Sequence, residues 1–381
     1  MEFAVKRMAL VYQYVRTLRN TFLVVLILSL IPLVWIGHIW KSKHLFLQSD
    51  NESAILKLNN ATTPVSDIKY GNNTVEIKQP MNNDRAHKIS NALRVNQNQT
   101  TGRGWVSVPR IGRLGNNMFQ FAAVMAMSKH YQMFPVYPPE ILDGIFNINR
   151  SGVLLDKENQ NSFPSIQMNE KKASAYDESI MTKDIPGNTN IKLCCYFQSW
   201  KYLRGIQEDL RRQFTFKPSI DSIAMRFINQ TLINNGDFKS NKHTALVGIH
   251  IRRSDMAGSE RSYNMGYRSA PKQYFQNAMK YFRIKFKHVH FIICTDDVKW
   301  AQDNIRSPDL TFSVGHSAGV DLAILSHCDH IIMSTGTFSW WAAWLSGGEV
   351  VYWAGWPKPN TYIGRITEPF DYFLPNWKPM L

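Results

Sequence analysis

From residue 105 onward, short apolar runs alternate with longer segments in which apolar residues recur at helical spacing. The short runs predict strands, at 105–108, 191–197, 245–251, 289–294, 310–314, 330–334 and 349–353. The longer segments predict helices, at 118–130, 202–212, 219–233, 271–285, 297–305, 320–328 and 338–345. This alternation predicts an α/β fold with parallel sheets between helices. The length suits two lobes, 105–238 and 239–381, divided at the Gly- and Asn-rich patch 234–241.

The apolar stretch 21–40 is long enough to cross a bilayer as one helix. Lys and Arg are denser before it than after it, so the positive-inside rule places residues 1–20 in the cytoplasm. No small-residue cleavage site follows the stretch, which favours a retained signal anchor over a cleaved signal peptide, the alternative interpretation. The rest of the chain is then expected in the secretory lumen or outside the cell.

Residues 41–104 are Asn-rich and aperiodic, and they are too poor in aromatic residues to fold alone. We interpret this segment as a glycosylated stem that holds the lobes away from the membrane. Asn-x-Ser/Thr sequons, the acceptor pattern for N-glycosylation, agree with a lumenal location. They occur at Asn51, Asn60, Asn72, Asn98, Asn149 and Asn229.

The formal net charge of +15 is spread along the chain rather than gathered on one helix. Such a surplus suits an anionic small ligand or polyanionic surroundings, and it argues against nucleic acid as a partner. The 4 cysteines are too few for a disulfide scaffold, and none shows the spacing of a zinc site. Cys294 and Cys328 are predicted either to form one long-range disulfide or to be buried free thiols.

The most informative run stands at the end of strand 245–251 and holds His250, Arg252, Arg253 and Asp255. A guanidinium offers a planar fork of donors that fits phosphate oxygens, and ligands of open α/β sheets bind beyond the carboxyl ends of strands. The run therefore predicts a seat for a phosphorylated ligand, with a surface salt-bridge cluster as the alternative.

Three further segments at predicted strand ends are candidates to contact the same ligand. The loop with Gly112, Gly115 and Asn116 leads into a helix and offers N–H groups to an anion, although an ordinary turn has the same pattern. A hydroxyl-rich turn precedes a Trp pair that suits either sugar contact or core packing, and two acids follow strand 289–294 as helix caps or nucleobase acceptors. These residues are Thr337, Phe338, Ser339, Asp296 and Asp297.

No Asp-x-Asp occurs in the chain, so no metal site is expected, and the two arginines would supply the positive charge. Glu260 follows Asp255 by five residues. A carboxylate beside a basic site suits a general base, whereas a solvated loop acid is the alternative.

Together, three motifs resemble the animal galactoside α1,2-fucosyltransferases: Gly112-Arg-Leu-Gly-Asn116, His250-x-Arg-Arg-x-Asp255 and Gly336-Thr-Phe-Ser-Trp-Trp341. The second motif is shared with α1,6- and protein O-fucosyltransferases, whereas the third is typical of the α1,2 branch. The resemblance implies a GT-B-like fold of two Rossmann-type domains, GDP-fucose as donor, a β-galactoside-terminated glycan as acceptor and no metal or other cofactor. It also implies a single-pass type II protein of the Golgi membrane with a lumenal catalytic domain.

Residue roles follow from the same resemblance. Arg252 is implied to contact the donor β-phosphate, with Arg253 and His250 nearby and with Ser339 and the Gly112 loop near the diphosphate. Asp296 or Asp297 is implied to lie near the guanine. The spacing from Asp255 to Glu260 resembles that of α1,6-fucosyltransferases, in which the Glu is the proposed base. An α1,6- or protein O-fucosyltransferase and a non-catalytic membrane lectin of the same fold are the alternative functions.

Overall fold

The computed structural model describes residues 104–137, 140–149, 163–235, 244–254, 256 and 260–381. The chain divides into two compact units, 1–82 and 83–381, and every described residue belongs to the second. The expected tail, anchor and nearly all of the stem, with the sequons at Asn51, Asn60, Asn72 and Asn98, lie outside the described residues. Within the described part, no helix is both long and apolar enough to cross a membrane.

The first lobe is built on a four-stranded parallel sheet with the strand order β2-β1-β4-β3. Its strands are β1 (Trp105–Ser107), β2 (Phe134–Val136), β3 (Ser165–Asn169) and β4 (Asn190–Cys194). The long helix α3 (Leu114–Tyr131) connects β1 to β2 and is buried on most of its surface, as its nearly continuous apolar sequence predicts. Short helices complete this half: α4 (Glu140–Asp143), α5 (Glu178–Met181), η3 (Trp200–Leu203) and α6 (Gln207–Gln213).

The second lobe is built on a six-stranded parallel sheet with the order β10-β9-β8-β5-β6-β7. Its strands are β5 (Ala245–Ile251), β6 (Val289–Thr295), β7 (Leu310–Phe312), β8 (His330–Met333), β9 (Val350–Trp353) and β10 (Lys378–Met380). Strand β5 lies between β8 and β6, and all its residues are buried, which explains its uninterrupted apolar sequence. Its helices are α9 (Glu260–Met265), α10 (Lys272–Lys285), α11 (Val298–Asn304), α12 (Ala318–Ser326) and α13 (Thr337–Ser346). Two parallel sheets with interleaved helices confirm the expected α/β class.

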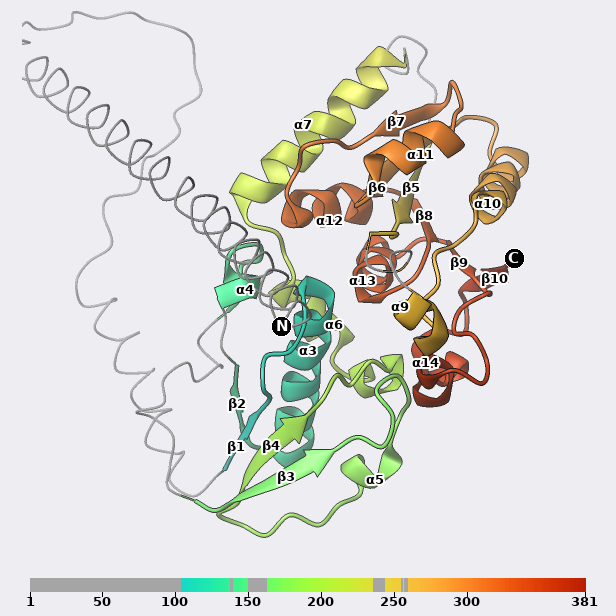
Figure 1. The fold of residues 1–381 in the computed structure, drawn as a ribbon. Coiled ribbons are helices and arrows are strands. Elements are labelled where there is room, and N and C mark those ends of the chain that lie inside the picture. The colour runs from blue at the N-terminus through green and yellow to red at the C-terminus, as the bar shows by residue number, and fades with distance from the viewer. Residues whose placement is uncertain (1–103, 138–139, 150–162, 236–243, 255, 257–259) are drawn as a thin grey trace, which may run out of the picture. The chain divides into compact units, whose positions relative to one another are not determined.

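The chain passes between the two sheets more often than a single boundary near 234–241 implies (Figure 1). Helix α7 (Pro218–Asn234) precedes that patch but packs on α12 of the second lobe. Near the C-terminus, α14 (Tyr362–Ile366) and α15 (Pro369–Tyr372) return toward the first lobe, where Thr367 forms a parallel bridge with Ser174. Strand β10 then rejoins the second sheet beside β9. The boundary patch itself lies mostly outside the described residues.

The strand predicted at 191–197 ends at Cys194, and two predicted helices differ from the structure as well. The helix expected at 202–212 is split into η3 and α6, because Gly205 between them adopts a left-handed backbone conformation with φ +77°. The helix expected to start at residue 118 starts at Leu114, so Gly115 and Asn116 belong to its first turn rather than to a loop. This difference matters for the site, because it brings a helix N-terminus to the glycine-rich segment.

Candidate functional site

The two lobes meet where the N-terminal turns of α3 and α13 touch. The Trp341 indole N–H donates to the carbonyl oxygen of Gly115 (3.0 Å), and the Phe119 ring lies 4.9 Å from the Trp341 ring. A Cβ at Gly115 would come within 2.6 Å of the Thr337 carbonyl carbon, so only glycine permits this approach. The Trp pair therefore packs in the core between the lobes, which was one of its two predicted roles.

The residues at the N-cap positions of the two helices are Arg113 and Gly336. Neither of them provides a side chain that accepts a hydrogen bond from the first turn of its helix. The first N–H groups of a helix lack partners within it and carry the positive end of its dipole. Two such ends at one point make a seat for an anion, the use proposed for both segments from the sequence. Thr337, Phe338 and Ser339 form the first turn of α13.

Arg252 extends from the carboxyl end of β5 to the turn that precedes α13. Its backbone N–H donates to the Ser334 hydroxyl (3.1 Å). Gly336 has φ +89°, and a Cβ there would lie 2.3 Å from the Arg252 Nη1 atom. The guanidinium thus lies directly over the glycine that opens α13, so a fixed positive charge stands beside the helix N-terminus.

His250 is buried behind this arginine and does not carry charge near neutral pH. Its Nδ1 atom lies 2.5 Å from the Ser339 hydroxyl, and its ring lies 4.7 Å from that of Phe338. Burial lowers the pKa of His250 to about 4, and the neighbouring Arg252 lowers it further against the opposing effect of Asp296. A neutral imidazole cannot attract a diphosphate by charge, and the contact with His250 holds the Ser339 hydroxyl in the first turn of α13.

Arg253 turns away from Arg252 toward α11. Its guanidinium lies over the Trp300 ring at 3.9 Å, and its Nε atom lies 3.4 Å from an Asp297 carboxylate oxygen. Asp297 also caps α11 through the Trp300 N–H (3.1 Å), as predicted. The Asp296 carboxylate accepts the N–H of Arg253 (2.8 Å) and thereby fixes the chain beyond β5. Asp296 and Asp297, one of which the resemblance implies near the guanine, both hold this turn.

The glycine-rich segment is tied to α13 and to the end of β4. Gly112 has φ +83°, and a Cβ there would clash with the Asn116 side chain at 2.1 Å. The Asn116 amide oxygen accepts hydrogen bonds from the Thr337 hydroxyl (2.8 Å) and the Gln198 amide (3.1 Å). One side chain therefore joins the two helix N-termini to a third segment, the turn after β4.

The turn after β4, residues 195–197, was not singled out from the sequence. Cys195 and Phe197 have φ +93° and +54°, although neither is glycine. Glu170, just beyond β3, accepts the N–H groups of Tyr196 (2.6 Å) and Phe197 (2.9 Å) and is only 8% exposed. Burial raises the pKa of Glu170 to about 8 although these N–H groups oppose the rise. A place directly after the predicted strand 191–197 could have marked Gln198, whereas no strand was predicted before Glu170.

The two acids after β5, the sequons and the cysteines are the remaining predicted residues. Glu260 is exposed at the first position of α9, and Asp255 lies outside the described residues. The sequon residues Asn149 and Asn229 are exposed, as glycan acceptors must be. In the described ranges no three His, Cys, Asp or Glu side chains gather as a metal site would require. All 4 cysteines are free, with Cys294 and Cys328 buried.

Comparisons with known proteins bear on the family. Galactoside alpha-(1,2)-fucosyltransferase 2 of Sus scrofa is 26% identical over 283 residues, which cover 72% of this chain and 79% of the relative. Galactoside 2-alpha-L-fucosyltransferase SEC1 of Bos taurus is 29% identical over 276 residues, which cover 70% and 71%. A crystal structure of NodZ alpha-1,6-fucosyltransferase soaked with GDP-fucose is 18% identical, at a TM-score of 0.42, over 64% of this chain and 92% of NodZ. Residues 73–380 match glycosyl transferase family 11. This match spans most of the sequence and confirms the resemblance found in its motifs: the chain belongs to glycosyl transferase family 11.

Proposed function

We propose that the protein transfers L-fucose from GDP-β-L-fucose to the 2-hydroxyl of a terminal β-galactoside, with inversion, to form an α1,2 linkage. The observation that carries the proposal is the junction of α3 and α13, where two uncapped helix N-termini meet beside Arg252. Fixed positive charge at one point suits the diphosphate of a sugar nucleotide. The names of the curated relatives support fucose as the sugar and a galactoside as the acceptor.

In this mechanism the acceptor oxygen attacks the anomeric carbon of fucose while the bond from that carbon to the diphosphate oxygen breaks. The transition state resembles an oxocarbenium ion, and negative charge grows on the departing GDP. Arg252 and the two helix ends stabilise that charge without having to reorganise. The acceptor hydroxyl proton passes to a carboxylate, and Glu260 on α9 is the candidate among the described residues.

The apolar stretch 21–40 and the sequons support a place for this activity on the Golgi membrane, with one span and the lobes in the lumen. Glycans of glycoproteins and glycolipids are built there, so terminal galactosides would be accessible to the lobes. Detection of glycans on Asn149 and Asn229 in the protein from its native source would support this orientation. Complete absence of glycans from every sequon would contradict it.

The direct test is to incubate the purified chain with GDP-fucose and lactose and to identify the product by NMR. We expect release of one GDP for each fucose transferred, and a fucose attached to O2 of galactose. Activity should persist in excess EDTA, because Arg252 and the helix ends provide the positive charge. Fucose attached at a primary hydroxyl would favour the α1,6 alternative, and absence of GDP release with any glycan would favour the non-catalytic lectin.

A further inference from the structure

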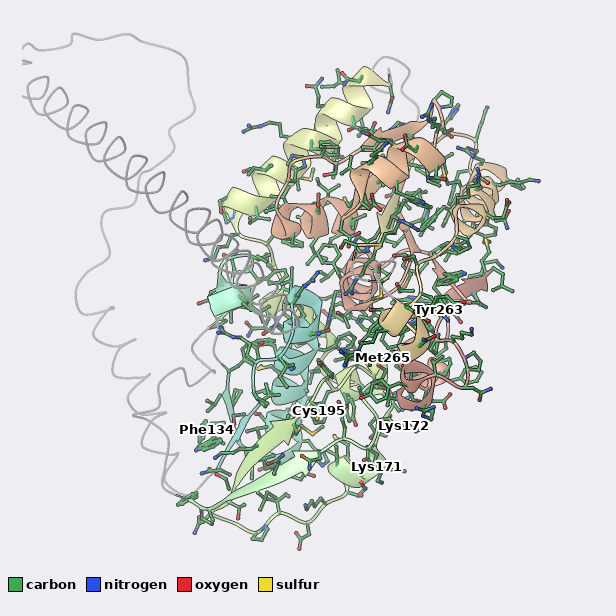
Figure 2. All side chains as sticks on the ribbon, in the orientation of Figure 1. Phe134, Lys171, Lys172, Cys195, Tyr263 and Met265 are labelled. Atoms are coloured by element: carbon green, nitrogen blue, oxygen red, sulfur yellow. The ribbon has the colours of Figure 1, made fainter. Side chains whose placement is uncertain are left out.

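An exposed aromatic side chain on α9 carries two cations on its ring. Tyr263 is 54% exposed and lies on the helix that follows the arginines after β5 (Figure 2). The guanidinium carbon of Arg268 lies 3.2 Å from the centroid of the Tyr263 ring, and the Lys358 Nζ atom lies 5.4 Å from it. The ring attracts both cations through its quadrupole and holds them near each other. We call Tyr263, Arg268 and Lys358 the Tyr263 cluster.

The positive charge of the Tyr263 cluster is not balanced by carboxylates. Among the residues that the structure describes, no Asp or Glu side chain forms a salt bridge with Arg268 or Lys358, whereas Arg253 has an acidic partner. The Arg268 Nη1 atom donates to the carbonyl oxygens of Tyr263 and Tyr267, the second at 3.0 Å. Its Nη2 and Nε groups donate to no residue of the described ranges, so they remain available to an anion.

Backbone contacts hold the segments of the Tyr263 cluster against each other. Gly266 directly follows α9, and a Cβ there would come within 2.2 Å of the Thr361 Oγ1 atom, so the end of α9 packs closely on the start of α14. The Thr361 hydroxyl also donates to the Lys358 carbonyl oxygen (2.7 Å). The loop that carries Lys358 is thus fixed beside the helix that carries Tyr263. Cations that are held in place before a ligand arrives bind it with a smaller loss of entropy.

The Tyr263 cluster lies beside the turn after β8. Strands β8 and β9 are parallel neighbours, so the loop after β9, with Lys358, and the turn after β8, with Gly336, emerge at the same edge of the sheet. The Thr335 hydroxyl in that turn donates to the Arg268 carbonyl oxygen (3.3 Å). Arg252, whose guanidinium lies over Gly336, is therefore linked to the cluster by a short series of contacts.

We propose that Arg268 and Lys358 bind an acidic group of the acceptor glycan, a carboxylate or a sulfate, while its terminal galactose lies at the turn after β8. This proposal rests on the proposed function and adds to it the chemical class of the acceptor. In the order β9-β8-β5-β6, the nucleoside of the donor is expected after β6 and the cluster follows β9, so the donor leaves these cations free. A guanidinium and an ammonium together can bind two oxygens of one anion.

The test compares β-galactosides that differ in one group. Lactobionate carries a carboxylate where lactitol carries a neutral hydroxymethyl group. N-acetyllactosamine with and without a sulfate at O6 of its N-acetylglucosamine is the second pair, which distinguishes sulfate from carboxylate. With the full-length chain, we expect kcat/KM to be about fivefold higher for the acidic member of at least one pair. The preference should decline as salt is added, because salt screens exposed charges.

Variants of Lys358 show whether the cluster causes this preference. Lys358→Gln should reduce the preference to less than about twofold, mainly by raising the KM for the acidic acceptor. Lys358→Arg keeps the charge and should keep the preference. Lys280→Gln is the matched control, because Lys280 is an exposed lysine on α10 and not part of the cluster, and it should leave the preference unchanged. The KM for GDP-fucose should change by less than about twofold in all variants.

The proposal would be overturned if the wild type preferred neither acidic acceptor, or if Lys358→Gln kept the full preference. Saturation-transfer NMR of the same glycans with the GDP-bound protein separates this proposal from the proposed function. A signal from an acidic glycan that weakens in Lys358→Gln, in a protein that transfers fucose to none of them, would reject the activity and keep the anion site. Absence of both fucose transfer and a signal that depends on Lys358 would reject both proposals.

Discussion

Two turns at the carboxyl ends of parallel strands serve the candidate site in opposite ways. The turn after β8 reaches its positive φ through Gly336, and it leads into a helix N-terminus whose N–H groups no side chain caps. The turn after β4 reaches positive φ at two non-glycine residues, and its N–H groups are accepted by Glu170. The first turn is thus shaped without strain and leaves the first N–H groups of α13 without a side-chain cap, whereas the second gives its N–H groups to a buried carboxyl within the fold. The two turns therefore differ in the partners of their backbone N–H groups.

The largest effect is expected from Arg252→Lys, beside the turn after β8. A lysine provides a point charge but not the planar fork that fits two phosphate oxygens, so kcat should fall by about 10²–10³. Arg253→Lys is the matched control, because Arg253 is engaged with Trp300 and Asp297, and it should lose much less. Steady-state GDP release measures both variants. Near-normal turnover in Arg252→Lys would show that the turn after β8 does not bind the diphosphate.

For the turn after β4, which Glu170 holds, Glu170→Ala should lower the free energy of unfolding. The change leaves two backbone N–H groups without their acceptor in a buried place, at a cost of about 3 kcal/mol in the free energy of unfolding. Glu170→Gln keeps one amide oxygen as acceptor and should cost about 1 kcal/mol. Chemical denaturation of the purified chain compares the two. Equal stability of wild type and Glu170→Ala would mean that the strained turn is held by its core contacts alone.

Alanine substitutions at two glycines test whether the backbone conformation of the turn after β8 matters for catalysis. Gly336 and Gly315 both have positive φ, but a Cβ at Gly315 meets no atom within 4 Å, whereas one at Gly336 meets Arg252. Both alanine variants should lose about 1 kcal/mol of stability from backbone strain. Only Gly336→Ala should lose activity, by about thirtyfold or 2 kcal/mol, because it displaces the guanidinium. Equal activity of the two variants would show that the function of Arg252 does not depend on the conformation of the turn after β8.

The contributions of His250 and Glu170 to the free energy of unfolding should change with pH in opposite directions. His250 has a pKa lowered to about 4, so the unfolded chain binds its proton first, and the stability from the neutral imidazole is lost as pH falls from about 6.5 toward 4. Glu170 has a pKa raised to about 8, so its contribution is complete below about 4.5 and is lost as pH rises through 8. Each slope is about 1 kcal/mol per pH unit inside its window.

Denaturation between pH 5 and 8 checks this with His250→Gln and Glu170→Gln as references. The wild type should lose stability relative to His250→Gln below pH 6.5, and relative to Glu170→Gln as pH rises toward 8. Parallel curves for the wild type and either variant would show that the corresponding side chain does not titrate as described.

The sequence points to the residues around the turn after β8 far better than to those around the turn after β4, for a physical reason. Arg252, Gly336 and Ser339 belong to contiguous runs in which residue type, strand end and helix start coincide. Glu170, Tyr196 and Gln198 owe their places to contacts between segments distant in the chain. A carboxyl that becomes buried, or a non-glycine residue that takes positive φ, leaves no local pattern.

The surroundings of the two acids after β6 show the same dependence on distant segments. Asp296 or Asp297 is predicted to lie near the guanine, and tertiary contacts that no local pattern shows engage both of them with Arg253 and with the turns after β5 and β6. The break at Gly205 was not predicted either, although a glycine inside a helical pattern permits the left-handed turn that ends the helix.

The late return of the chain to the first lobe has a consequence for biosynthesis. Ser199 donates to the Asp371 carbonyl oxygen (2.8 Å), and Tyr176 N–H donates to the Asp371 carboxylate (2.8 Å), so the first lobe is completed by residues that are synthesised after strands β5 to β9. The lobe synthesised first must therefore wait for the segment around Asp371 before it is protected, although domains usually mature in the order of synthesis. Limited proteolysis of a chain ending at residue 361 should cut the first lobe readily, and resistance equal to that of the whole chain would show that it matures unaided.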